Sequence, residues 1–109
     1  MAALTVQTAA MAGITLTAQP PAGGGDSFAN DGDTVVFFYN QSGSPITVTF
    51  DAAGGDEGLT LTDPTCEVPA GGAYVAGPFE MEWFNDANGN VNMTYSAVTS
   101  LSVFVLKLN

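Results

Sequence analysis

The stretch TVVFFYNQSGSPITVTF, residues 34–50, gives the clearest indication of the fold class of this chain. Residues 34–40 form a continuous apolar run of strand length, rich in β-branched and aromatic residues, which is typical of a central strand buried on both faces. Residues 46–50 alternate apolar side chains with threonine, the period of a strand with one buried face. Residues 41–45 between them are turn formers, so we predict that the two strands pair as a hairpin.

Short apolar segments separated by turn residues continue through the rest of the chain. Further strands are predicted at 59–62, 66–68, 73–76, 79–84, 91–96 and 101–108. No segment has a helical period, and turn signals recur at the spacing of about 8–12 residues that is typical of an all-β sandwich or barrel. We therefore predict an all-β fold, an antiparallel β-sandwich of about seven to nine strands, with Ig-like and jelly-roll strand orders both open.

The first 25 residues differ from the remainder because they carry no charge. Apolar and polar residues alternate at 4–8 and 14–17, and a double proline followed by three glycines then interrupts the pattern. We predict an N-terminal arm or first hairpin over residues 1–25 and a β-sandwich domain over residues 26–109.

Charge and composition exclude several function classes. The 109 residues include 11 acidic residues against one basic residue, Lys107, and no histidine, for a formal net charge of -10. Without a cluster of Lys and Arg we expect no binding to nucleic acid or to anionic membranes. Without histidine, a Ser-His-Asp or Cys-His arrangement is absent, so we expect no enzyme and no cofactor.

Acidic residues offer weak candidates for catalysis or metal binding. Glu80 and Glu82 would share one strand face, as a glycosidase pair requires, but a solvated face opposite Phe79, Met81 and Trp83 explains them better. The loop at residues 86–90 resembles the start of a calcium loop but lacks its final glutamate, and its Asn-Gly pair predicts a hairpin turn instead.

Two further features have structural interpretations. A second calcium loop could use Asp26, Asn30, Asp31 and Asp33, but we assign no metal site. Cys66 is the only cysteine and has no basic neighbour, so we expect a packing residue rather than a nucleophile. A single cysteine also fits folding in a reducing cytoplasm.

Candidate contact residues are apolar. In the uncharged N-terminal segment they are Leu4, Val6, Ile14 and Leu16. Trp83 and Phe84 are open to two interpretations, a subunit contact or binding platform and, favoured here, core packing.

Turn motifs over residues 26–105 resemble those of a known group of proteins. The motifs are ANDGDT (29–34), SPITVT (44–49), PAGG (69–72), GPF (77–79), FNDANGNV (84–91) and TYSAVT (94–99). Together they resemble small β-sandwich virion proteins of tailed bacteriophages, which include capsid decoration (cement) and minor head proteins. The group has no defined site, so the resemblance assigns no functional residues.

The resemblance implies a non-enzymatic structural virion protein. We expect it on the capsid surface, assembled in the host cytoplasm, bridging and stabilising subunits of the major capsid protein as a homo-oligomer, either a trimer or a dimer. Two alternatives remain open, a carbohydrate- or receptor-binding module of a phage fibre and a neck or tail component. The binding module predicts exposed aromatic rings among Trp83, Tyr39, Tyr74 and Tyr95.

Overall fold

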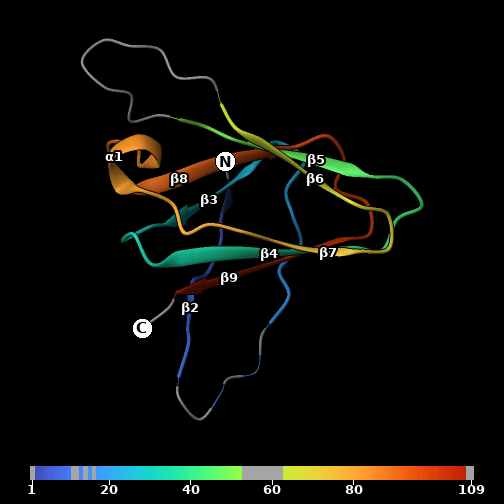
Figure 1. The fold of residues 1–109 in the computed structure, drawn as a ribbon, viewed down its shortest axis with the longest axis horizontal. Helices are drawn as coiled ribbons and strands as arrows, with labels where there is room; N and C mark the ends of the chain where they lie inside the picture. Colours follow the sequence, from blue (N-terminus) through green and yellow to red (C-terminus); the bar gives the residue numbers. More distant parts are fainter. Residues whose placement is uncertain (1, 11–12, 14, 16, 53–62, 108–109) are drawn as a thin grey trace.

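Two β-sheets packed face to face make up the fold (Figure 1). A computed structural model describes residues 2–10, 13, 15, 17–52 and 63–107. The five-stranded sheet has the order β1 (Ala2–Ala3), β3 (Asp26–Ala29), β8 (Asn90–Tyr95), β5 (Ile46–Phe50) and β6 (Thr65–Val68). The four-stranded sheet has the order β2 (Gln7–Thr8), β9 (Leu101–Lys107), β4 (Thr34–Asn40) and β7 (Ala73–Ala76). The predicted antiparallel β-sandwich is confirmed.

Alternating side chains build the core between the sheets. In β5, Ile46, Val48 and Phe50 are buried while the two threonines are half-buried, as its sequence period predicts. In β9, alternate residues from Leu101 to Val105 are likewise buried. Phe79 lies at the centre of an aromatic cluster, with ring centroids 4.9 Å from Phe50 and 5.4 Å from Phe84. Each such buried side chain contributes about 1.5–3 kcal/mol from the hydrophobic effect.

The predicted hairpin of residues 34–50 is wrong, because β4 and β5 lie in different sheets. Both edges of β4 pair with other strands, β9 on one side and β7 on the other. The connection crosses between the sheets, and the buried Asn40 side chain holds it there. Its Nδ2 donates to the carbonyl of Ser44 at 2.8 Å and to that of Val68 in β6 at 3.2 Å.

The predicted strand over residues 79–84 is also wrong. Met81–Phe84 form one helical turn, α1, closed by the Asn85 amide donating to the carbonyl of Met81. A strand would bury Phe79, Met81 and Trp83, whereas the helical turn places Phe79 and Phe84 against the core and leaves Met81 exposed. Among the described residues no helix has the length and apolar character needed to cross a membrane.

The N-terminal segment runs from one sheet to the other. β1 pairs in parallel with β3, and β2 pairs in parallel with β9. Between them, the Leu4 side chain is only 9% exposed and joins the core. The returning chain lies alongside, because the Gln19 side chain bonds the backbone of Thr5 and Gln19 itself bridges to Val103.

Candidate interaction surface

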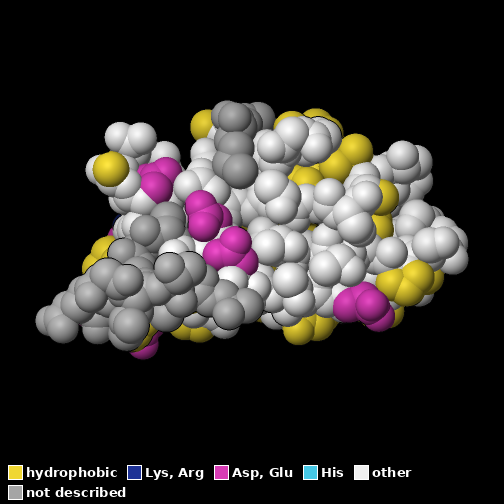
Figure 2. Space-filling view, turned by 90° about the horizontal axis from the view of Figure 1, so that it is seen from above, with side chains coloured by type: hydrophobic (Ala, Val, Ile, Leu, Met, Phe, Trp, Pro, Cys, Tyr) yellow, Lys and Arg dark blue, Asp and Glu magenta, His cyan; other side chains and the backbone are white. Residues whose placement is uncertain are grey.

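The outer face of the five-stranded sheet is polar and acidic. Thr47 and Thr49 of β5 and Asn92 and Thr94 of β8 alternate with buried neighbours, so their side chains point outward. Thr49, Asn92 and Thr94 line a shallow hollow of about 300 Å³ together with Asp51 and Asp63. Figure 2 views this face and shows mainly polar surface crossed by acidic side chains.

The outer face of the four-stranded sheet is apolar. We call six of its residues the apolar face. They are Val35, Phe37 and Tyr39 of β4, Val75 of β7, and Phe104 and Leu106 of β9. Phe37 is in register with both Val75 and Phe104, and Val35 with Leu106. Tyr39 is 42% exposed and Val75 52% exposed, while Phe37, Phe104 and Leu106 are half-buried and Val35 is buried. Such a face on a soluble protein typically marks an interaction site.

No charged side chain lies on the apolar face. The strands of the four-stranded sheet contain one acidic or basic residue, Lys107. Lys107 is in register with the buried Thr34, on the inward side, and its Nζ lies 2.9 Å from the Asp31 carboxylate. The acidic residues that the structure describes therefore lie elsewhere, and the two outer faces of the sandwich differ sharply in polarity.

The apolar face was missed by sequence reasoning, which predicted that residues 34–40 are buried on both faces. β4 is central in its sheet, and Val35 and Val36 are both buried, but Tyr39 is exposed. The sequence did carry a signal for this face, because side chains alternate along a strand. Phe37 and Tyr39 therefore point to the side opposite to that of Val36 and Phe38.

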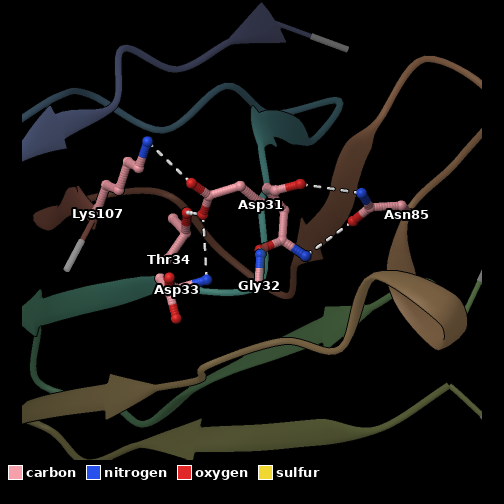
Figure 3. A network of polar contacts seen from close by, with 7 residues as sticks. Asp31, Gly32, Asp33, Thr34, Asn85 and Lys107 are labelled. Carbon is pink, nitrogen blue, oxygen red and sulfur yellow. Dashed lines mark hydrogen bonds and ion pairs between the residues drawn. The ribbon is translucent and has the colours of Figure 1, made fainter. Parts of the chain in front are cut away.

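A polar network closes one end of the sandwich (Figure 3). The buried Asn30 side chain donates to the carbonyl of Phe79 at 3.0 Å and to Oδ1 of Asn85 at 2.8 Å. Beside it, the Asp31 carboxylate meets Lys107 and accepts the Asp33 amide at 3.1 Å. The Lys107 ammonium lowers the pKa of Asp31, and Asp31 raises that of Lys107. These hydrogen bonds and the ion pair hold the loop between β3 and β4 in place.

The second calcium loop considered from sequence is not assembled. Asp26 lies fully buried at the start of β3, where its Oδ2 accepts the Tyr95 hydroxyl at 2.6 Å and the Ala22 amide at 3.1 Å. Asp31 is exposed and bound to Lys107. The carboxylates of Asp26 and Asp31 therefore bind different neighbours. Across the described residues, no group of three His, Cys, Asp or Glu side chains could hold a metal ion.

The Asp86 loop is held by its own hydrogen bonds. The carboxylate accepts the amides of Asn88 at 2.8 Å and Asn90 at 3.0 Å, and the Asn92 side chain at 3.0 Å. These donors lower the pKa of Asp86, the Asn90 amide most. Gly89 adopts φ 79°, which suits glycine. A tight turn therefore forms at the Asn-Gly pair, but the predicted hairpin is wrong, because the turn joins α1 to β8 and not two strands.

Burial raises the pKa of both Tyr95 and Cys66. Burial, and then the hydrogen bond to Asp26, raise the pKa of the Tyr95 hydroxyl. Burial also raises the pKa of the Cys66 thiol, which keeps it protonated. Glu80 is exposed just before α1 and Glu82 is exposed within it, so the two glutamates do not share a strand face as expected.

The contact residues predicted from sequence lie at separate places. Leu4 is buried, and Val6 is half-buried against the core. Phe84 packs against Phe79, and Trp83 is half-buried beside it in α1. Ile14 and Leu16 lie outside the described residues.

No protein-family model, curated protein or solved structure matches this chain. The two unlike outer faces are therefore the main guide to function.

Proposed function

We propose that this chain is a non-enzymatic structural protein of a tailed-phage virion, which decorates the capsid by docking its apolar face on the major capsid protein. The observation that carries the proposal is the contrast between the uncharged apolar face and the acidic outer face of the five-stranded sheet. A protein that coats a capsid lattice needs one face that binds the capsid and an opposite face that keeps the particle soluble.

The apolar face suits the bound side. Aromatic side chains supply large contact area and dominate binding energy at protein interfaces. Phe37, Tyr39 and Phe104 stand on paired strands, so a rigid sheet holds them ready for contact. A preorganised surface loses little conformational entropy on binding.

The acidic face suits the solvent side. Particles coated with many copies would present Asp51, Asp63 and Glu67 outward, and like charge keeps such particles apart in solution. The turn motifs of residues 26–105, which resemble those of phage β-sandwich proteins, support the same assignment.

Particle binding tests this proposal. Purified virions should contain the chain at a copy number comparable with that of the major capsid protein, and its absence from particles would overturn the proposal. A copy number restricted to a single ring would instead indicate a neck or tail component.

A matched pair of variants tests which face binds. Tyr39→Glu places a charge on the apolar face, and Thr94→Glu places the same charge on the opposite face, both at exposed strand positions. We expect Tyr39→Glu to weaken particle binding at least about tenfold, equal to about 1.4 kcal/mol, and Thr94→Glu to retain it. Equal binding by both variants would exclude docking through the apolar face.

The carbohydrate-binding alternative has one observation in its favour. Tyr39 is 42% exposed and Tyr74 38% exposed, on neighbouring strands. However, Tyr74 is in register with the inward-pointing Phe38, so the two rings start from opposite faces of the sheet. Binding on a glycan array that Tyr39→Ala abolishes would favour this alternative over decoration.

A further inference from the structure

The strand β7 is the least protected sheet edge in the described part of the chain. Exposed edges offer unpaired backbone groups, and proteins usually shield them with charges or covering segments. The edge strand β6 carries Glu67, and β1 has two residues. The edge formed by β2 is covered, because the Gln7 side chain bonds the backbone of Thr17. In β7, by contrast, the sequence AYVA has no charge, and Val75 is 52% exposed.

The free backbone groups of β7 can be assigned from the ladder. The Asn40 amide donates to the carbonyl of Gly72 at 2.9 Å, just beyond the paired residues of β4 and β7. Hydrogen-bonded pairs alternate in an antiparallel ladder, so Tyr74 and Ala76 bond to β4. The amides and carbonyls of Ala73 and Val75 therefore point away from the sheet.

We infer that a second copy of this chain pairs with β7 in antiparallel fashion, about a two-fold axis at Val75. In this register Val75 of one copy faces Val75 of the other. The outward amide and carbonyl of each Val75 then bond those of the other, as backbone groups do where a strand adds to a sheet edge. A two-fold contact uses the same patch on both copies, so it produces a dimer rather than a trimer.

Charge favours this edge for self-pairing. Each copy carries a formal net charge of -10, so two copies repel wherever their carboxylates meet. Neither β7 nor its neighbour β4 contains a charged residue. A basic partner would gain nothing from this uncharged strand, whereas a second copy meets no carboxylate on the strand itself.

Area points the same way. The strands β2, β9, β4 and β7 are 2, 7, 7 and 4 residues long. At about 4.8 Å between strands and about 3.3 Å per residue, they span roughly 320 Å² on one sheet face. Stable interfaces bury about 800 Å² per partner. Pairing through β7 joins two apolar faces into one surface of roughly 640 Å² on a continuous eight-stranded sheet, which is much nearer to that size than one face alone. The inference does not depend on what that surface binds.

Sedimentation of the purified chain over a wide concentration range tests the dimer. Val75→Pro removes only an outward amide and keeps the bonds to β4, because proline is tolerated at such an edge position. Val75→Glu keeps the amide and places two carboxylates at the two-fold axis, and Thr94→Glu is its control on the opposite face. We expect a dimer for the unchanged chain and for Thr94→Glu, a folded monomer for Val75→Pro, and a dissociation constant raised at least about tenfold for Val75→Glu.

Three results would overturn the inference. They are a monomer at every concentration, a trimer, and dimers of both Val75 variants with unchanged affinity. Should Val75→Pro fail to fold, as circular dichroism would reveal, Val75→Glu decides alone. A monomer that still binds particles would reject the dimer and leave the proposed function standing, and a dimer that binds no particles would do the reverse.

Discussion

The Tyr95 hydroxyl donates a 2.6 Å hydrogen bond to Oδ2 of Asp26, and so joins β8 to the start of β3 inside the sandwich. Asp26 is 0% exposed, and its Oδ1 has no hydrogen-bond partner among the described residues. A buried carboxylate that keeps so few donors depends strongly on each one.

Removal of this hydroxyl should destabilise the fold. Tyr95→Phe retains the ring but leaves Asp26 with the Ala22 amide as its remaining donor among the described residues. Hydrogen bonds to charged groups contribute about 1.5–3 kcal/mol, and we expect a loss of that size in the free energy of unfolding from urea titration. Thr94→Ala, at the exposed neighbour, should change it by less than about 0.5 kcal/mol. Equal effects would show that the hydroxyl contributes nothing specific.

Tyr95 also predicts how stability changes in alkali. Its pKa is raised in the folded protein above the ordinary value of 10.0, so the unfolded chain releases this proton first. The contribution of Tyr95 to stability is therefore fully present below pH 10.0 and is lost as the pH rises above it. The free energy of unfolding should fall less steeply in Tyr95→Phe, whereas Tyr39→Phe, at an exposed ring, should follow the unchanged chain. Identical slopes in all three proteins would contradict the role given to Tyr95.

The lowered pKa of Asp86 leads us to expect a loss of stability in acid. Three donors hold its pKa below the ordinary value of 3.8, so this contribution is present above pH 3.8 and disappears as the pH falls below it. We expect Asp86→Ala to lower the melting temperature at neutral pH and to flatten its decline in acid. Asp51→Ala serves as the control, because it removes an exposed carboxylate elsewhere. A decline in acid as steep in Asp86→Ala as in the unchanged chain would refute this prediction.

The amides of Asn30 and Asn85 should be energetically coupled. Each bonds the other residue, Asn30 Nδ2 to Asn85 Oδ1 at 2.8 Å and Asn85 Nδ2 to the Asn30 carbonyl at 3.0 Å. A double-mutant cycle with Asn30→Ala and Asn85→Ala, followed by chemical denaturation, should give a coupling energy of about 0.5–3 kcal/mol. Additive effects would mean that the two side chains act independently on the loop and on α1.

Strands with a clear period were predictable because burial alone determines them. β5 and β9 form where apolar residues alternate or run together, and each buries the side chains that its pattern indicates. Local turn chemistry was equally readable at Asp86–Asn90, where an Asx side chain and a glycine act within five residues.

Sheet membership was not predictable from the same signals. A strand pattern and a short turn look alike whether the next strand pairs alongside or crosses to the opposite sheet. Here the crossover is accompanied by a hydrogen bond from Asn40 to Val68, which is 28 residues away along the chain. The helical turn at α1 was missed for a related reason. Phe79 and Phe84 satisfy a core site assembled from distant strands, and the alternation of residues 79–84 carries no trace of it.

The candidate interaction surface could likewise not be predicted from local sequence patterns. An uncharged chain segment was predicted to make contacts, and its Leu4 is instead part of the core. The apolar face depends on which side of β4 and β9 lies outside, and only the packing of the two sheets determines that side.

A cryo-EM map of the virion would show directly whether this chain docks on the capsid through its apolar face. We expect density for this chain on the outer capsid surface, with β4, β9 and β7 against the major capsid protein and the five-stranded sheet toward solvent. Density with the five-stranded sheet against the capsid, or a capsid surface without this chain, would contradict it.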